Sequence, residues 1–98
     1  MNKYPRVALV TGGGRGIGKA IALELSKNAT SIAVNYLHDK ESADKTVGQI
    51  TKAGGIAKAF QANISEKDEV ETLINAVVNE FGKIDILVNN AGTIKDSL

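Results

Sequence analysis

The chain has 98 residues, of which 43% are hydrophobic and 23% charged, and its formal net charge is +1. This length holds at most one small domain, and the balanced charge gives no electrostatic reason to expect a nucleic-acid or membrane-surface partner. The absence of cysteine excludes a disulfide framework and thiolate chemistry. The N-terminus lacks a signal-peptide core and no apolar run is long enough to span a membrane, so we expect a cytoplasmic protein, without a metal site.

Apolar segments alternate between strand-like runs and helical periodicity along the chain. In chain order the predicted elements are a strand over Val7–Thr11, a helix over Ile17–Lys27, a strand over Ser31–Asn35, a helix over Lys40–Ala53, a strand over Ile56–Gln61, a helix after Ser65 that ends at Gly82, and a strand over Ile84–Asn89.

Strands that are apolar on both faces and alternate with helices predict a parallel sheet covered on both sides. Right-handed crossovers then give the strand order 3-2-1-4. The predicted fold class is therefore α/β, a Rossmann-type doubly wound parallel sheet, of which the chain forms the front half.

Three local predictions concern how the helices begin, end and pack. The first helix is expected to turn one apolar face inward, made of Ile17, Ala20, Ile21 and Leu25. Asn28 is expected to take the left-handed conformation after it, where a glycine would be usual. Ser65 is expected to cap the third helix, since acidic residues follow it.

The segment Thr-Gly-Gly-Gly-Arg-Gly-Ile-Gly at 11–18 follows the first strand directly. Glycines let a backbone approach a phosphate, and the N-terminus of the next helix attracts an anion. The G-x-G-x-x-G spacing is absent, and a Walker A loop fails because Ala20 stands where a hydroxyl is needed. The pattern that fits is T-G-x-x-x-G-x-G, which indicates a phosphate-binding loop.

Residues near the end of the second strand bear on which nucleotide would bind. NAD sites usually place an acid there to bind the ribose 2′-hydroxyl, but this chain has Asn35, Tyr36 and Leu37, and no acid before Asp39. Arg15 in the glycine loop is suited to clamp phosphate oxygens. The absence of a repelling acid and the presence of a cation favour NADP(H).

The glycine loop, together with Asn-Asn-Ala-Gly at 89–92, resembles the amino-terminal half of the short-chain dehydrogenase/reductase family, and within it bacterial 3-oxoacyl-[acyl-carrier-protein] reductases. The resemblance covers essentially the whole chain and implies the cofactor contacts. The pyrophosphate and ribose would be lined by Gly12, Gly14, Arg15, Gly16, Ile17 and Gly18. Asn63 and Ile64 would lie beside the adenine, with the Asn63 carbonyl as an acceptor. Asn90, Ala91 and Gly92 would pass the ribose, and the Asn90 side chain would either contact the ligand or brace the central strands.

The resemblance also implies where the reaction takes place. Members of the family use a Ser, a Tyr and a Lys for hydride transfer, with Tyr and Lys spaced as Y-x-x-x-K. Tyr36 and Lys40 have this spacing but follow the second strand, at the adenosine end, so we interpret them as a coincidental match. We therefore predict no catalytic residue in this chain, and we expect residues 1–98 to be the NADP(H)-binding part of one domain whose catalytic half lies elsewhere.

The function implied is NADPH-dependent reduction of a 3-oxoacyl thioester, carried by acyl-carrier protein or coenzyme A, in a longer protein that forms a homotetramer. Three alternatives stay open. One is a sugar-alcohol or other short-chain dehydrogenase, which shares the same front half. Another is a nucleotide-binding or interaction module that catalyses nothing, and the third is an NTP-binding switch.

Overall fold

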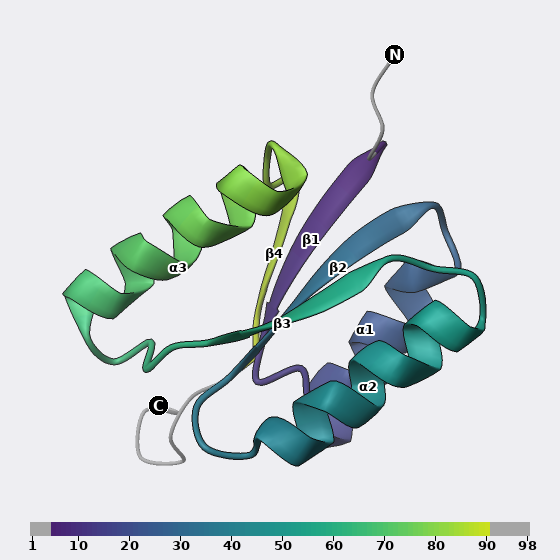
Figure 1. Ribbon diagram of the computed structural model, residues 1–98, viewed down its shortest axis with the longest axis horizontal. Helices are drawn as coiled ribbons and strands as arrows, with labels where there is room; N and C mark the ends of the chain where they lie inside the picture. Colours follow the sequence, from purple (N-terminus) through teal and green to yellow (C-terminus); the bar gives the residue numbers. More distant parts are fainter. Residues whose placement is uncertain (1–4, 91–98) are drawn as a thin grey trace.

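The computed structural model describes residues 5–90, which form a four-stranded sheet with helices on both faces (Figure 1). The elements are β1 (Arg6–Thr11), α1 (Gly16–Ser26), β2 (Thr30–Tyr36), α2 (Lys40–Lys52), β3 (Ala57–Gln61), α3 (Lys67–Phe81) and β4 (Ile86–Asn89). None of the helices in this range has the length and apolar character needed to cross a bilayer.

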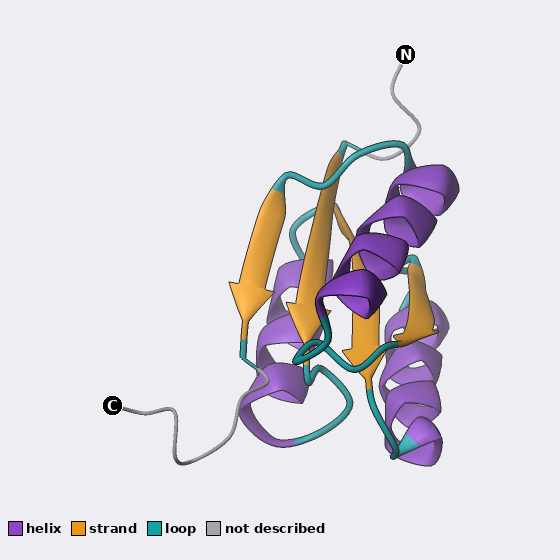
Figure 2. Ribbon diagram, turned by 90° about the vertical axis from the view of Figure 1, so that its left-hand side faces the viewer, coloured by secondary structure: helices purple, strands orange, loops and turns teal. Residues whose placement is uncertain are grey.

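The strand order is β3-β2-β1-β4 and all three pairings are parallel. Ala8 in the central strand β1 lies opposite Ile32 of β2 on one side and Ile86 of β4 on the other. Helices α1 and α2 cover one face of the sheet and α3 covers the opposite face (Figures 1 and 2). The predicted doubly wound α/β fold and its strand order are confirmed.

The core consists of two apolar layers, because successive side chains of a strand point to opposite faces. Val7 and Leu9 of β1 pack toward α3, in a cluster with Leu73, Val77 and Phe81. The other layer lies under α1 and α2 and is formed by Ala8, Val10, Ala22, Ile32, Val34, Ala43 and Ile50. β1 is thus buried on both faces.

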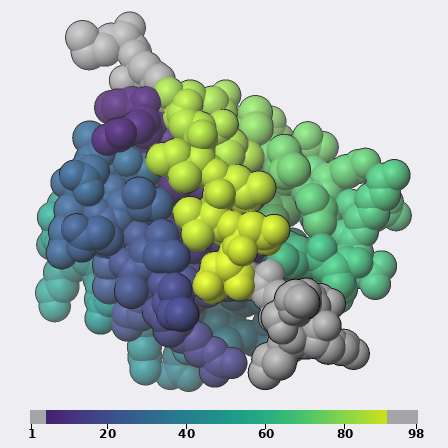
Figure 3. All heavy atoms as spheres, turned by 180° about the vertical axis from the view of Figure 1, so that it is seen from behind, coloured from purple at the N-terminus to yellow at the C-terminus, as the bar shows by residue number. Residues whose placement is uncertain are grey.

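β4 is the outer strand of the sheet, and within residues 5–90 it pairs with β1 only. Figure 3 shows it at the molecular surface, in yellow, beside the green α3. Leu87, on the α3 side, is 61% exposed, and Ile74 and Val78 of α3 are also exposed. The α3 face of the sheet is therefore only partly covered by the described residues.

The expected inward face of α1 is only partly confirmed, because Leu25 packs against the core and Ile21 is half-buried, but the other two residues are exposed. Ile17 is 73% exposed and Ala20 is exposed, whereas the residues that α1 buries are Gly18 and Ala22. The reason is the close approach of α1 to the glycine loop, since a Cβ atom on Gly18 would collide with the carbonyl oxygen of Gly12. Close approach selects the smallest residues rather than the most apolar ones.

The turn after α1 is also built differently from the prediction. Ala29 has the positive φ, at 56°, and Asn28 does not. Asn28 instead donates from Nδ2 to the carbonyl of Glu24 at 3.1 Å, so its side chain closes the last turn of the helix. This hydrogen bond satisfies one of the carbonyls that every helix leaves unpaired at its C-terminus.

Ser65 does not cap α3, because the N-cap residue is Glu66 and its side chain makes no capping hydrogen bond. The backbone N–H and hydroxyl of Ser65 both donate to Oδ1 of Asn63, at 3.0 and 2.6 Å. Asn63 thus forms a local turn that competes with helix capping, a common role for asparagine.

Candidate functional site

A cleft of about 660 Å³ opens at the carboxyl end of the sheet. This is the edge at which ligands bind in doubly wound folds, and the volume lies within the usual range for ligand pockets. The lining residues come from the carboxyl ends of β2 and β4, from the segments after β1, β2 and β3, and from the first turn of α2. They are Gly12, Gly14, Arg15, Asn35, Tyr36, Leu37, His38, Asp39, Ser42, Ala62, Asn63, Ile64, Ser65 and Asn89.

The glycine loop forms one wall of the cleft. Gly12 and Gly16 have φ values of 64° and 62°, a conformation that side-chain-bearing residues rarely adopt. The N–H of Gly13 donates to the carbonyl of Asn35 at 3.2 Å, which ties the loop to β2. The loop leads into the N-terminus of α1, whose unpaired N–H groups suit an anion.

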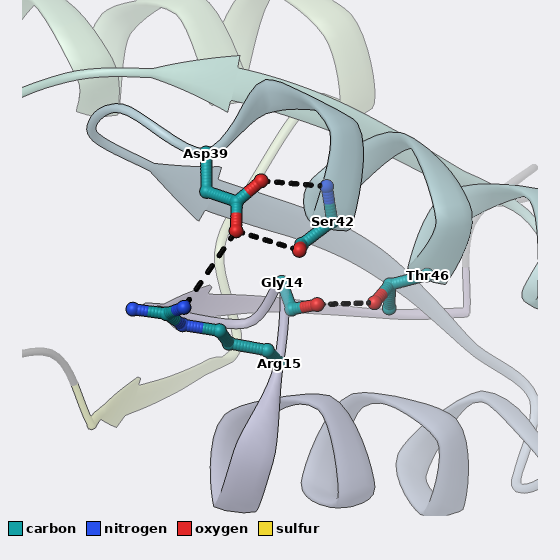
Figure 4. Close-up of polar contacts among 5 residues, drawn as sticks. All are labelled: Gly14, Arg15, Asp39, Ser42 and Thr46. Carbon is teal, nitrogen blue, oxygen red and sulfur yellow. Dashed lines mark hydrogen bonds and ion pairs between the residues drawn. The ribbon is translucent and has the colours of Figure 1, made fainter.

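Helix α2 supports the loop from the side. Thr46 is fully buried and its Oγ1 donates to the carbonyl of Gly14 at 3.0 Å (Figure 4). A Cβ atom on Gly14 would lie 3.0 Å from the backbone nitrogen of Ala43, so the two segments are in close contact. The position of the loop therefore depends on α2 as well as on β1.

The end of β4 braces the loop from the other side. Nδ2 of Asn90 donates to the carbonyl of Gly12 at 3.2 Å, and its backbone N–H donates to Oγ1 of Thr11 at 3.0 Å. Together with the collision that a side chain at Gly18 would cause, these contacts fix the junction of β1, α1 and β4. The Asn90 side chain thus makes the bracing contact.

Asn35 is buried rather than displayed at the end of β2. Its Nδ2 atom lies 3.4, 3.3 and 3.2 Å from the carbonyl oxygens of Tyr36, Phe60 and Ala62. Its side chain is 2% exposed. A carboxylate at this position would face carbonyl oxygens in place of a donor, which gives a structural reason for asparagine here.

The polar end of the cleft pairs Arg15 with Asp39 at 3.8 Å (Figure 4). Asp39 is the N-cap of α2, where it accepts from the hydroxyl and the backbone N–H of Ser42, at 2.7 and 3.0 Å. These two hydrogen bonds, the hydroxyl first, hold the pKa of the Asp39 carboxyl below its ordinary value, and Arg15 adds to the effect. A fixed carboxylate thus lies beside the predicted phosphate-binding arginine.

Asn63 lies at the opposite wall, after β3. Its Oδ1 atom accepts twice from Ser65, and its backbone N–H donates to Glu69 at 2.7 Å. The carbonyl acceptor that was expected to serve the adenine is therefore already used within the protein. Within residues 5–90 no hydrogen bond occupies the Asn63 amide nitrogen, which is a donor.

The structure gathers most of the predicted cofactor residues into the cleft: Gly12, Gly14, Arg15, Asn35, Tyr36, Leu37, Asn63 and Ile64. Gly16, Ile17, Gly18 and Asn90 lie outside its lining, and Ala91 and Gly92 lie outside the described residues. Sequence reasoning missed Ser42, Ala62, Ser65 and Asn89, and did not assign His38 and Asp39 to the site. An Asp directly before a predicted helix is an N-cap signal, which would have located Asp39 at the start of α2.

Tyr36 and Lys40, the matching Y-x-x-x-K pair, lie at the end of β2 and the start of α2. Nζ of Lys40 binds the carboxylate of Asp44 at 2.7 Å, and this hydrogen bond raises the pKa of Lys40. No cluster of metal-ligating side chains is found between residues 5 and 90.

A family model described as "short chain dehydrogenase" matches residues 6–98. The chain belongs to this family. Among curated members, the short-chain dehydrogenase/reductase homolog YusS of Bacillus subtilis is 52% identical over 91 residues, and this chain covers 84% of it. The 3-oxoacyl-[acyl-carrier-protein] reductase FabG of Staphylococcus aureus (strain Mu50) is 47% identical over 96 residues.

Solved structures of two dehydrogenases superimpose closely on this chain. A dehydrogenase/reductase from Sinorhizobium meliloti has a TM-score of 0.88 and 40% identity over 93% of this chain. Acetoin dehydrogenase YohF from Salmonella typhimurium has a TM-score of 0.83 and 33% identity over 95% of this chain. The chain spans 39% of the Staphylococcus aureus reductase and 36% and 37% of these two structures, but 84% of YusS.

Proposed function

We propose that residues 1–98 form the NADP(H)-binding amino-terminal part of a Rossmann domain. The glycine loop and the α1 N-terminus would hold the pyrophosphate, because their backbone conformation admits close approach of an anion. The residues after β2 and β3 would enclose the adenosine, since they line the same cleft. Arg15 would bind a ribose 2′-phosphate, for which its guanidinium is suited.

Within a whole protein, we propose that this site serves the reduction of a 3-oxoacyl thioester to the 3-hydroxyacyl form. The observation that carries this proposal is the 47% identity to a 3-oxoacyl-[acyl-carrier-protein] reductase, over 98% of this chain. When bound, NADPH supplies the hydride for such a reduction. The residues described here bind and orient the nucleotide, and groups outside this chain would polarise the substrate carbonyl and deliver the proton.

The proposed partners follow from the same identity to a 3-oxoacyl-[acyl-carrier-protein] reductase. The substrate would be an acyl group on acyl-carrier protein or coenzyme A, and the whole protein would be a cytoplasmic homotetramer. A net charge of +1 gives no support for a nucleic-acid partner.

A second candidate function is nucleotide binding without hydride transfer. YusS favours it, because this chain covers 84% of that relative at 52% identity. A protein of this extent would contain the adenosine half of the site but none of the catalytic residues that the family resemblance implies.

Calorimetric titration of the purified protein with NADPH and NADH tests the binding step. We expect measurable binding with NADPH the tighter ligand, and Arg15→Ala should remove most of the difference. Lys27→Ala is the matched control, because Lys27 is an exposed cation at the end of α1 and does not line the cleft. A protein that binds neither nucleotide contradicts the proposal.

Turnover separates the two candidate functions. The whole protein, isolated at its natural length and identified by its intact mass, is mixed with NADPH and acetoacetyl-coenzyme A, and loss of NADPH absorbance is followed with the 3-hydroxy product analysed by mass spectrometry. Product formation supports the reductase, whereas tight binding without product supports the binding module.

A further inference from the structure

Asp39 lines the cleft near the end of β2, where an acidic side chain affects the relative affinity for NAD and NADP. It follows the end of β2 by three residues and lines the same cleft as Gly12, Gly14 and Arg15. Its side chain is 44% exposed and that of Arg15 is 81% exposed, so both are accessible to a ligand. Figure 4 shows the Asp39 carboxylate pointing toward the Arg15 guanidinium across the opening of the loop.

The Asp39 carboxylate is held in this place by α2. Oδ1 accepts from the backbone N–H of Ser42 at 3.0 Å, and Oδ2 accepts from the Ser42 hydroxyl at 2.7 Å. Rotation of the side chain away from the cleft would break both bonds and leave the α2 N-terminus uncapped. The carboxylate therefore cannot withdraw from an incoming anion without loss of the cap.

Arg15 has no comparable anchor among the interactions of the described residues. The one ion pair that its side chain makes in this range is with Oδ2 of Asp39, at 3.8 Å, and the residue is the N-cap position of α1. A ribose 2′-phosphate that binds this guanidinium would have to share it with, or displace it from, Asp39. The phosphate would also experience the negative charge of Asp39 directly, and like charges at this range repel.

We infer that Asp39 is a selectivity residue of the site, which competes with a 2′-phosphate for Arg15 and thereby lowers the preference for NADP over NAD. The inference rests on the proposed nucleotide-binding function. It goes beyond that function because it assigns opposite effects to two side chains of one ion pair. Arg15 favours the phosphorylated cofactor, and Asp39 limits the size of that preference.

The test is Asp39→Asn, because asparagine caps helices about as well as aspartate and has nearly the same size without the charge. Affinities for NADP⁺ and NAD⁺ are measured by isothermal titration calorimetry at low ionic strength. We expect Asp39→Asn to raise the affinity for NADP⁺ about three- to fivefold relative to NAD⁺, the size of an exposed charge interaction. The gain should shrink at about 1 M salt, where the screening length falls to about 3 Å.

Asp44→Asn is the matched control. Asp44 is an exposed carboxylate on the same helix, paired with Lys40, and it does not line the cleft. This variant should leave the NADP⁺/NAD⁺ ratio unchanged. An equal shift in both variants would assign the effect to net charge and overturn the inference.

A second variant background tests the route through Arg15. In Arg15→Gln protein, the additional Asp39→Asn change should raise the relative NADP⁺ affinity less than in the unaltered protein, because there is no guanidinium to release. Nucleotide binding with an unchanged ratio in Asp39→Asn refutes the role of Asp39 alone. Absence of binding by the unaltered protein refutes the proposed function itself, and the inference with it.

Discussion

The carboxylate of Asp85 accepts the backbone N–H of Val7 at 2.8 Å, while the N–H of Asp85 donates to the carbonyl of Val7 at 2.8 Å. This reciprocal pair joins residues 78 apart in the sequence and extends the β1–β4 ladder by one step. Lys83 lies 3.2 Å from the same carboxylate. The side chain of Asp85 thus replaces a strand acceptor at the start of β4.

Removal of this acceptor should weaken the outer strand. We expect Asp85→Ala to lower the thermal unfolding midpoint by a few degrees, because the Val7 N–H loses its charged acceptor. Asp44→Ala is the control, since that carboxylate makes only an exposed ion pair with Lys40. Equal midpoints for the two variants, measured by circular dichroism, would show that the Val7 contact contributes nothing.

Acid should destabilise the fold through two carboxylates. The pKa of Asp39 is lowered chiefly by the Ser42 hydroxyl, and that of Asp85 chiefly by the Val7 N–H, both from an ordinary value of 3.8. Groups whose pKa is depressed in the folded state contribute stability above their unfolded pKa and lose it as pH falls through the folded pKa. Urea midpoints should therefore decline below about pH 4, and the decline should be shallower in Asp39→Asn/Asp85→Asn.

The hydrogen bond from Thr46 to Gly14 should matter for both stability and binding. Thr46→Val keeps the shape of the side chain but leaves the Gly14 carbonyl without its buried donor. We expect a loss of about 1–3 kcal/mol in the free energy of unfolding and weaker NADPH binding. Thr46→Ser, which retains the hydroxyl, should recover most of the binding, and a Ser variant as weak as the Val variant would argue against the hydrogen bond.

Two glycine-to-alanine changes should have opposite effects. Gly18→Ala drives a methyl group into the Gly12 carbonyl and the Asn90 amide, so we expect a loss of about 3 kcal/mol. Gly48→Ala lies inside α2 with no atom within 4 Å of the added carbon, so we expect a gain of about 0.5–1 kcal/mol. Chemical denaturation measures both, and a tolerated Gly18→Ala would show that the loop can move away from α1.

Asn35→Asp should destabilise the protein because the new carboxylate would face the carbonyl oxygens of Phe60 and Ala62. We expect a loss of about 3 kcal/mol at neutral pH, and less in acid, where the carboxyl is protonated. Asn75→Asp, an exposed position on α3, is the isosteric control. A small, pH-independent loss at Asn35 would contradict the role given to its amide.

The sequence predicts the order and type of every element, because β1, β2 and β4 are short runs rich in apolar residues, β3 lies between turn signals, and the helices have periodic apolar residues. It also locates the glycine loop, whose positive φ values at Gly12 and Gly16 demand the residue found there. The errors concern contacts between segments. The buried side of α1 is set by the approach of Gly18 to Gly12, and no periodicity within one helix reports such a contact.

In the candidate site, too, the sequence predicts the residues but not the contacts between segments. Arg15 and the residues after β2 follow from motif spacing, but the partner of Arg15 does not. In the sequence, Asp39 lies beyond the end of β2, where NAD sites usually carry their acid. In the structure, its hydrogen bond to Ser42 caps α2 and its carboxylate lies 3.8 Å from Arg15 of the glycine loop. Likewise, the sequence predicts that the Asn63 side-chain oxygen accepts a hydrogen bond from the adenine, but in the structure this oxygen accepts from Ser65.

The central place of β1 has a kinetic consequence. Arg6 pairs with Thr30, but the other neighbour of β1 arrives only with β4, as in the pairing of Ala8 with Ile86. Contacts between residues so far apart slow folding, because a long loop must close before the pairing stabilises it. Since Asn90 braces Gly12, the final form of the glycine loop depends on the docking of β4, so the nucleotide site requires contacts between residues far apart in the sequence.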